Sequence, residues 1–351
     1  MEPPSSDKQP PSLTLSIVIV NWNGLRVLRR CLESIQQTAN DIDHEIIVVD
    51  NHSSDASTTM VRDSFPNVTL IENPTNSGFA AANNIAIAAS HGEWLLLLNN
   101  DTELHPNCLQ TALDYLQSHP ETGALGARAV FPDGSHQTTC YRFNTPWVLF
   151  LTRFLPLASS FHEHLNYGRY FARKFSSPTH VDCVAGCFLM LSRDLANRIG
   201  PLDEDFFMYG EDEVWCHRIH QTGKFVTYHP DCVITHSHRH SSPKTARQLN
   251  DWEFFHPVLV VLKTLGPRSA SLANAILTAG SLLRFPFWLY HDLIHSSRLR
   301  DLTTLIRKRS RILLKQLSRA PMVGPDRRRS FKFQVFSFKG KTQDNKTQDT
   351  R

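Results

Sequence analysis

The sequence lacks the short motifs that identify several large enzyme classes. Its 351 residues contain no GxxxxGKS/T loop, GxGxxG fingerprint, HExxH pair or serine nucleophile elbow. These absences exclude P-loop NTPases, dinucleotide-binding dehydrogenases, zincin metalloproteases and α/β-hydrolases. The chemistry of the protein must therefore reside in other polar clusters.

The sequence also has few cysteines, and they do not form close pairs. The seven cysteines are an odd number, are scattered along the chain and include no CxxC motif. In a chain of this length the pattern indicates reduced thiols rather than a disulfide framework or a zinc site. Cys183 and Cys187 lie four residues apart in an apolar stretch, and we expect both of them to pack in the core.

An apolar stretch is missing from the first twelve residues, MEPPSSDKQPPS. A secretory signal peptide needs such a stretch, so we expect none and expect the chain to stay in the cytoplasm. The polar, proline-rich composition of residues 1–12 predicts a disordered lead-in.

Charge of both signs is present, but it is unevenly distributed. Residues 1–240 carry 16 Lys and Arg against 26 Asp and Glu, whereas residues 241–351 carry 21 against 7. The net charge of +4 therefore combines an acidic region with a strongly basic one. A uniformly basic nucleic-acid binder does not have this distribution, so we expect no nucleic-acid partner. The asymmetry indicates two regions with different partners.

Short apolar runs alternate with helical patterns from Leu13 onward. This alternation predicts an α/β fold in which a mainly parallel sheet is flanked by helices on both faces. Ligands of such sheets bind beyond the carboxyl ends of the strands. Four polar clusters occupy those ends, namely Asn21–Asn23, Asp50–Asp55, Asn76–Asn84 and Asn99–Glu103.

The following residues are less regular in pattern. Residues 135–180 are rich in aromatics, histidine and proline, which suits an insertion over the site or an acceptor surface. We expect residues 181–192 to form one further buried strand and residues 225–236 to form a pair of strands.

Residues 249–318 consist of apolar segments at helical spacing, followed by a helix with interleaved Arg and Lys. We expect an amphipathic helical extension that lies in a membrane interface, with a basic face toward anionic headgroups. Two alternatives stay open. Residues 269–290 could span the bilayer, or the helices could pack on the catalytic domain or on a second copy in a homo-oligomer. Residues 319–351 form a basic and polar tail.

Carboxylates at strand ends are the candidates for binding chemistry. Asp50 can accept hydrogen bonds from a base edge or a ribose hydroxyl, although Asp followed by Ser and Asp also caps helices. Asp101 follows the most apolar strand and is suited to hold a divalent cation against a diphosphate. His236 ends a later strand, and its imidazole could complete that metal site.

Two adjacent acids, Glu211 and Asp212, open a helical segment after FFMYG. Acids at the start of a helix often serve only to stabilise that helix end. The functional alternative is that one of them is a general base that deprotonates an acceptor hydroxyl.

Taken together, these clusters resemble the family 2 glycosyltransferases of the GT-A fold, in particular their bacterial rhamnosyltransferase-like branch. The resemblance runs from about Leu13 to His240, and its segments occur in family order. The segments are SIVIVNWNG, EIIVVDNHSSD, NSGFAAANNIAI, WLLLLNNDTEL, VAGCFLMLSR, GPLDEDFFMYGEDE and VITHSH. The resemblance implies a GT-A domain over residues 13–248, with a Rossmann-like, mainly parallel mixed sheet.

The resemblance also implies roles for single residues. Asp50 would bind the uracil or thymine and the ribose of the donor, and Asp101 would bind Mg²⁺ or Mn²⁺ with His236 completing the metal shell. Asp212 would be the catalytic base, and Glu211 would orient it or contact the acceptor. The remaining residues would line or close the nucleotide-sugar pocket: Asn21, Asn23, Asn51, Asn76, Gly78, Phe79, Asn83 and Asn99, the last of which replaces the first carboxylate of the DxD motif.

The activity implied is inverting transfer of a sugar from a nucleoside-diphosphate donor, of the dTDP-rhamnose or UDP-hexose type. The acceptor would be a hydroxyl of a glycan or lipid-linked glycan in cell-surface polysaccharide synthesis, at the inner face of the plasma membrane. One position departs from the family pattern, which usually has an Asp where this chain has Val214. The adjacent Glu213 points about 100° away on a helix.

Two other functions remain as alternatives. A sugar nucleotidyltransferase would need a glycine-rich basic loop after the first strand, and NWNGLRVLRR does not supply one. A non-catalytic scaffold subunit could bind a nucleotide sugar or the membrane without turning over a substrate. The acids at 101 and 212 argue against the scaffold.

Overall fold

A computed structural model describes residues 13–154, 175–237 and 246–295 of the chain. The predicted lead-in over residues 1–12 and the tail over residues 319–351 lie outside the described residues. The same holds for the central part of the irregular region, and for the end of the helical extension from residue 296 onward.

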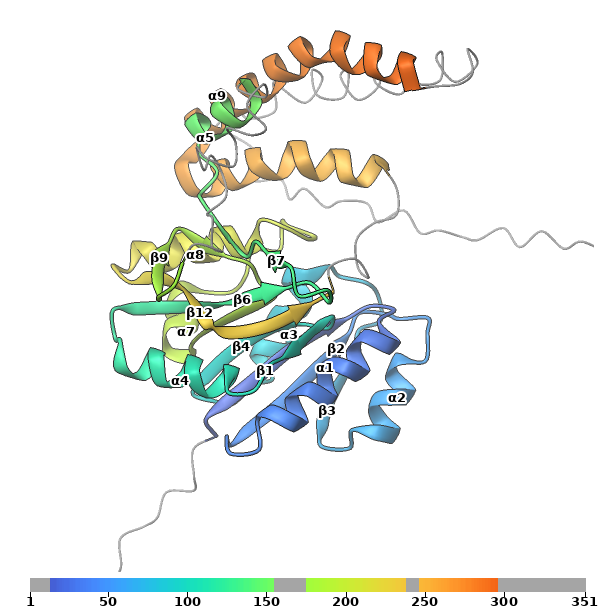
Figure 1. Cartoon of the computed structure of the whole chain (residues 1–351), viewed down its shortest axis with the longest axis vertical. Coiled ribbons are helices and arrows are strands. Elements are labelled where there is room, and N and C mark those ends of the chain that lie inside the picture. Colours follow the sequence, from blue (N-terminus) through green and yellow to red (C-terminus); the bar gives the residue numbers. More distant parts are fainter. Residues whose placement is uncertain (1–12, 155–174, 238–245, 296–351) are drawn as a thin grey trace, which may run out of the picture.

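Four parallel strands form one half of the central sheet, in the order β3-β2-β1-β4 (Figure 1). They are β1 (Leu15–Asn21), β2 (His44–Asp50), β3 (Val68–Glu72) and β4 (Trp94–Asn99). The helices that connect them are α1 (Leu25–Thr38), α2 (Ser57–Ser64) and α3 (Phe79–Ala88). The predicted alternation of strands and helices is therefore confirmed in this half.

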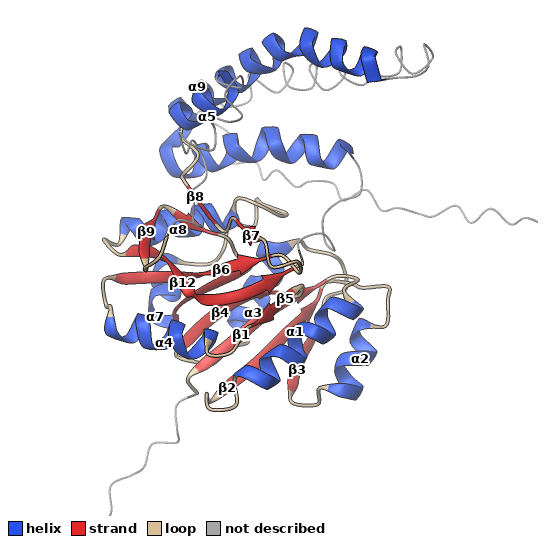
Figure 2. Cartoon of the chain, in the orientation of Figure 1, coloured by secondary structure: helices blue, strands red, loops and turns tan. Residues whose placement is uncertain are grey.

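The other half of the sheet is mixed. It continues with β11 (Phe188–Ser192), β6 (Thr122–Val130), β12 (Phe225–His236) and β5 (Thr102–Leu104). β11 runs antiparallel to both of its neighbours, β6 and β12 run parallel to each other, and β5 is antiparallel at the edge. The helices of this half are α4 (Cys108–Ser118), α7 (Arg193–Ile199) and α8 (Glu211–Gln221). The predicted mainly parallel mixed sheet is confirmed (Figure 2).

Two predicted strands differ from the structure. Residues 225–236 form one continuous strand with a register shift between His229 and Val233, not a pair of strands. Pro230 lies within that shift and has no backbone N–H for the ladder, so a bulge accommodates it. Residues 181–192 do not form one strand either, because a turn at Ala185 separates β10 (Cys183–Val184) from β11.

Small strand pairs border the mixed half. They are β7 (His136–Gln137), which pairs with β6, β8 (Cys140–Tyr141), which pairs with β10, and β9 (Thr179–Val181), which pairs with β12. β7 places Gln137 within hydrogen-bond distance of His236, the last residue of β12.

The core has two layers, one on each face of the sheet, because successive strand side chains point to opposite faces. Ile17 and Ile19 of β1 pack with the α1 side chains, whereas Val18 packs with the alanines of α3. All seven cysteines are buried and form no disulfide, and Cys183 and Cys187 lie in the two core layers, so their predicted core packing is confirmed.

The C-terminal helix α9 (Ala246–His295) is interrupted at Gly266, whose φ of 83° and ψ of 177° are not helical. Pro267 follows directly, so the chain bends into two arms (Figure 1). The second arm packs on α5 (Pro146–Phe154) through Leu149, Ala273 and Leu277. The predicted helical extension is thus present, and among the described residues no helix is long and apolar enough to span a membrane.

Candidate active site

The carboxyl ends of β1 and β2 bring Asn21 and Asp50 into register. The amide of Asn21 donates to Asp50 Oδ1 over 2.9 Å and accepts from the Nδ2 atom of Asn100 over 2.8 Å. All three side chains are buried. Their mutual bonds hold the Asp50 carboxylate at the strand end, where a ligand of an α/β sheet binds.

The loops after β1 and β2 are bonded to each other. Asn23 donates its backbone N–H to Ser53 Oγ over 2.8 Å, and its side-chain oxygen accepts from the Ser54 N–H over 2.7 Å. Ser53 in turn donates its N–H to Asp50 Oδ2 over 2.8 Å. Asn23 and His52 both have positive φ, 52° and 65°. Non-glycine residues adopt this conformation rarely, and such strain clusters at functional sites.

Asn51 connects β2 to the loop that precedes α3. Its Oδ1 accepts from the Ser77 N–H over 3.0 Å, and its Nδ2 donates to Asn76 Oδ1 over 2.9 Å and to the Gly78 carbonyl over 3.0 Å. The side chain is buried, so these bonds are shielded from water. One asparagine therefore fixes the conformation of the whole 76–78 loop.

Gly78 and Phe79 contact the segment before α8. Gly78 has a φ of 87°, and a Cβ at this position would lie 2.5 Å from the carbonyl oxygen of Phe207. That same carbonyl accepts the Phe79 N–H over 2.7 Å. The Asn83 amide donates to the Phe79 carbonyl of its own helix over 2.9 Å and is buried.

Asp212 lies next to this loop across Gly186. A Cβ at Gly186 would lie 3.4 Å from the Phe79 ring and 3.9 Å from Asp212 Cβ, so both side chains border Gly186. The Asp212 carboxylate accepts the Gly186 N–H over 3.2 Å and the Glu213 N–H over 2.8 Å. Burial raises the pKa of Asp212, and these backbone hydrogen bonds oppose the rise.

Three consecutive acids at the start of α8 share a small volume. Burial and the neighbouring Asp212 charge raise the pKa of Glu211 well above its ordinary value, and Glu211 Oε2 has no hydrogen-bond partner in the described residues. Burial raises the pKa of Glu213 to about 7, against the effect of hydrogen bonds from the Asn144 backbone and side chain. Asp212 is the acid whose charged form receives the most backbone donors, so it is best suited to act as a carboxylate.

Asp101 and His236 meet where β5 pairs with the end of β12. Asp101 Oδ1 lies 3.1 Å from His236 Nε2, and Asn99 Nδ2 lies 3.3 Å from the same nitrogen. His236 Nδ1 lies 3.1 Å from Gln137 Oε1, an acceptor, so Nδ1 carries the proton and donates it there. In the neutral imidazole, Nε2 then presents a lone pair toward the carboxylate.

Two electron-rich atoms at this distance repel each other unless a proton or a cation lies between them. A carboxylate oxygen and an imidazole nitrogen are ligand types that Mn²⁺ accepts, and Mg²⁺ accepts the carboxylate. No group of three or more His, Cys, Asp or Glu that could hold a metal occurs within the described part of the chain. The pair therefore fits a cation that takes its other ligands from a diphosphate and water.

Several residues of this region carry no recognisable sequence signal. Gln137 reaches His236 only because the short β6–β7 pair folds back beside β12. Gly186 is noticed only in the structure, where Phe79 and Asp212 both border it and its N–H bonds the Asp212 carboxylate. Asn100 stands between Asn99 and Asp101 in the sequence, so its proximity to the site could have been anticipated from the cluster itself.

A comparison with protein-family models decides the family. The model described as "Glycosyl transferase family 2" matches residues 16–200, more than half of the chain. The chain belongs to this family. The resemblance stated from the sequence motifs is thereby confirmed, and the protein is a glycosyltransferase.

Curated relatives of this glycosyltransferase include an N-acetylglucosaminyl-diphospho-decaprenol L-rhamnosyltransferase of Mycobacterium tuberculosis. It is 25% identical over 241 residues, which cover 65% of this chain and 77% of that protein. An uncharacterized glycosyltransferase of Haemophilus influenzae is 35% identical over 107 residues, 30% of this chain and 35% of that protein. The rhamnosyltransferase-like branch is therefore supported.

Solved structures confirm the GT-A fold of this glycosyltransferase. Residues 1–349 of S. aureus TarS in complex with UDP-GlcNAc superpose with a TM-score of 0.51 at 15% identity, covering 89% of this chain and 82% of that one. GalNAc-T7 with UDP, GalNAc and Mn²⁺ gives a TM-score of 0.50 at 18% identity, covering 72% of this chain and 50% of that one.

Proposed function

We propose that this glycosyltransferase moves a sugar from a nucleoside diphosphate to a hydroxyl of a glycan or lipid-linked glycan, with inversion. The observation that carries the proposal is the approach of Asp212 to the Gly78–Phe79 loop across Gly186. This approach places the acid pair, Glu211 and Asp212, beside the loop that would cover the donor. The M. tuberculosis relative is named for a lipid-diphosphate acceptor and L-rhamnosyl transfer, which supports a deoxyhexose or hexose donor and a lipid-linked acceptor.

The donor nucleoside would bind at the ends of β1 and β2. Asp50 is buried beneath the loops and held by Asn21 and Ser53, so it is preorganised to accept from a uracil or thymine base and a ribose hydroxyl. Asn23 and Asn51 would border this pocket, and the Asn76–Phe79 loop, fixed by Asn51, would close over the nucleotide sugar. Asn83 would act by fixing the first turn of α3.

Asp212 would accept the proton of the acceptor hydroxyl as that oxygen attacks the anomeric carbon, while the nucleoside diphosphate leaves from the opposite face. A single displacement of this kind inverts the anomeric configuration. The raised pKa of Asp212 brings its basicity toward neutral pH, which favours proton transfer. Burial and the Asp212 charge raise the pKa of Glu211 well above its ordinary value, which favours its neutral form and lowers the competing negative charge beside Asp212.

Asp101 and His236 would hold Mg²⁺ or Mn²⁺, with Asn99 beside them and Gln137 fixing the imidazole. When bound, the cation supplies neutralisation of the negative charge that develops on the leaving diphosphate. Gln137 would keep the proton on Nδ1, so that Nε2 presents its lone pair to the metal.

The helical extension would bring the enzyme to a membrane-borne acceptor at the inner face of the plasma membrane. On α5 the ring of Trp147 is 65% exposed and stacks on Phe150, with centroids 5.7 Å apart. On the second arm of α9, Leu272 and Leu283 are also exposed. Exposed aromatic and aliphatic side chains beside a strongly basic sequence are typical of helices that lie in a lipid interface.

The test is a panel of UDP-, dTDP- and GDP-sugars, measured by thermal shift with and without Mn²⁺. A single nucleotide class should raise the melting temperature, and more so with the cation. Slow release of nucleoside diphosphate from the matching donor should accompany that shift. A protein that binds a donor and never releases the diphosphate, with any acceptor, would instead be a scaffold.

A further inference from the structure

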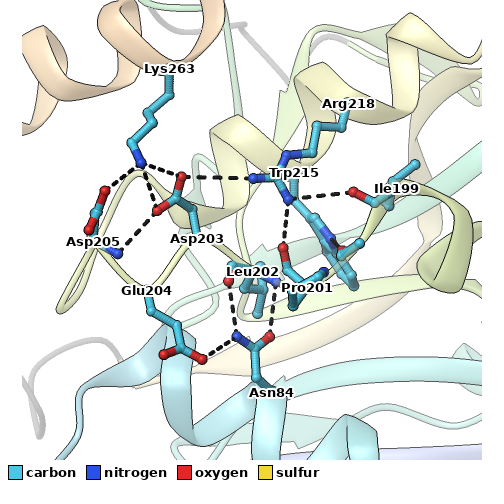
Figure 3. Close-up of polar contacts among 11 residues, drawn as sticks. Asn84, Ile199, Pro201, Leu202, Asp203, Glu204, Asp205, Trp215, Arg218 and Lys263 are labelled. Atoms are coloured by element: carbon cyan, nitrogen blue, oxygen red, sulfur yellow. Dashed lines mark hydrogen bonds and ion pairs between the residues drawn. The ribbon is translucent and has the colours of Figure 1, made fainter. Parts of the chain in front are cut away.

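The first arm of α9 packs on the segment that leads into the acid pair. Lys263 Nζ lies 2.9 Å from Asp203 Oδ2 and 2.5 Å from Asp205 Oδ2, so one ammonium group bridges two carboxylates (Figure 3). Burial lowers the pKa of Lys263, but the hydrogen bonds to both aspartates outweigh it and raise the pKa. The ammonium group is therefore charged at neutral pH.

Apolar contacts form a second anchor one helical turn away. Val260 is buried against Phe206 and Val214. A Cβ at Gly210 would lie 2.7 Å from the Phe206 ring and 3.0 Å from Val260 Cγ2, so the arm lies directly on the residue that caps the start of α8. Val214, the position where the family pattern usually has an acid, is thus a core residue that receives the C-terminal helix.

The same segment is held from its other sides by α3 and α8. Asn84 of α3 exchanges two hydrogen bonds of 2.9 Å with the backbone N–H and carbonyl of Leu202, and Arg218 of α8 donates to the Pro201 carbonyl over 2.6 Å (Figure 3). Arg218 also lies 3.8 Å from Asp203. Residues 201–206 are therefore fixed by three helices, α3, α8 and the first arm of α9.

The contacts of Lys263, Val260, Asn84 and Arg218 hold a segment that contains a strained backbone. Tyr209 has a φ of 70° and Gly210 a φ of 105°, directly before the acid pair at 211 and 212. Non-glycine residues adopt such conformations rarely, and these persist only where neighbouring contacts impose them. The segment also supplies the Phe207 carbonyl that bonds the Phe79 N–H.

We propose that Lys263 and Val260 are positioning residues, and that the first arm of α9 is a working part of the active site. The arm fixes residues 203–210 so that Phe207 closes on the donor loop and Asp212 is presented beside Phe79. The inference rests on the proposed role of Asp212. It also assigns residues 256–265 to the catalytic unit and leaves the membrane-facing role to the part of α9 beyond Gly266.

The ion pairs of Lys263 with Asp203 and Asp205 are partly exposed to solvent, so added salt can test their contribution. The side chain of Lys263 is 28% exposed and that of Asp205 is 46% exposed, so added salt screens the pair. Partly exposed ion pairs stabilise only modestly, so losing both should lower the protection of the 203–210 amides about fivefold.

The experiment compares Lys263→Met and Lys263→Arg with Arg268→Met in the full chain. Arg268 is an exposed cation just beyond the break in α9 and forms no ion pair with any described residue. Hydrogen exchange of the 203–210 amides is followed with nucleotide affinity, kcat and donor KM. In Lys263→Met, amide protection should fall about fivefold and kcat should fall two- to fivefold, while nucleotide affinity stays at the wild-type level.

Lys263→Arg should restore both readouts, and Arg268→Met should change neither. In the wild type, protection of these amides should fall with added NaCl, whereas in Lys263→Met it should not. Unchanged exchange and kcat in Lys263→Met, or a loss of protection spread over the whole sheet, would overturn the proposal. If Asp212 is not the base, Asp212→Asn retains transfer while Lys263→Met still loosens the segment, so the two failures are distinguishable.

Discussion

The Asp101 carboxylate and the His236 imidazole lie 3.1 Å apart, although Asp101 lies in the turn before β5 and His236 is the last residue of β12. Gln137 fixes the ring from the other side. Second-sphere partners of this kind contribute about 10- to 100-fold to metal affinity. Gln137→Leu should therefore weaken Mn²⁺ binding in the presence of a nucleoside diphosphate by that factor, as measured by titration calorimetry or by the Mn²⁺ electron paramagnetic resonance signal.

His236→Ala should weaken the same binding further, because it would remove a direct ligand of the proposed cation. His91→Ala is the matched control, since His91 is an exposed histidine that pairs with Glu45 at the opposite ends of the strands. Equal Mn²⁺ affinity in the wild type and both site variants would contradict the assignment.

Gly78 provides a prediction about donor binding. Gly78→Ala should lower donor affinity more than about tenfold. The alanine backbone would have to keep the positive φ of Gly78, and its Cβ would lie 2.5 Å from the Phe207 carbonyl oxygen. Gly134→Ala separates these effects, since Gly134 has a φ of 82° but no atom lies near its Cβ position. Both variants should lose about 1–2 kcal/mol of unfolding free energy from backbone strain, and only Gly78→Ala should lose donor binding.

Asp212→Asn tests the proton acceptor. General bases contribute about 10²- to 10⁴-fold, so transfer should fall by at least that lower factor while nucleotide binding is nearly retained. Transfer and binding are measured on the same preparation. A turnover near the wild-type rate would rule out Asp212 as the base. In the wild type, the midpoint of the rising limb of the pH–rate profile should lie at a higher pH than the pKa of an ordinary aspartate, because the pKa of Asp212 is raised.

The raised pKa of Glu213 predicts that the stability of the protein depends on pH. Its pKa rises from 4.5 to about 7 on folding, so the folded state binds more protons than the unfolded state between these values. The free energy of unfolding should therefore fall as pH rises from about 4.5 to about 7, by at most about 3 kcal/mol from this residue. Chemical denaturation at a series of pH values should give a shallower decline for Glu213→Gln. An identical slope in both proteins would show that Glu213 is not protonated in the folded state.

Membrane association should depend on the exposed apolar side chains of α5 and α9. Trp147→Glu combined with Leu283→Glu should reduce co-sedimentation with anionic vesicles, because both side chains are largely exposed and would have to enter the headgroup region. Phe225→Glu is the control, since Phe225 is an exposed aromatic at the start of β12, away from these helices. Unchanged sedimentation of the double variant would place the membrane contact elsewhere.

The parallel half of the fold was predictable because its strands are continuous apolar runs and its helices follow directly. The run Leu95–Leu98 is an example, since every side chain in it is buried. Prediction failed where tertiary context decides. Pro230 indicates a break, but the pairing of β12 with β6 carries the strand through it as a bulge. The hydrophobic pattern of the sequence does not indicate the turn at Ala185.

The candidate site was predictable to the extent that its residues follow strands. Asn21 and Asp50 meet because parallel strands end at the same edge. Gln137 and Lys263 were not predictable, because each acts from an element whose position depends on packing of the whole domain. Val214 could be recognised only as a departure from the family pattern, and its contact with Val260 supplies the physical reason.

The burial of all seven cysteines has a practical consequence. Thiol reagents attack accessible thiolates, so the folded protein should show a very low background in maleimide labelling. A single cysteine introduced at an exposed position, such as Thr59 on α2 or Ser271 on the second arm of α9, would then be the dominant labelling site. Fluorophores attached there would report the approach of the helical extension to a vesicle without removal of any native residue from the core.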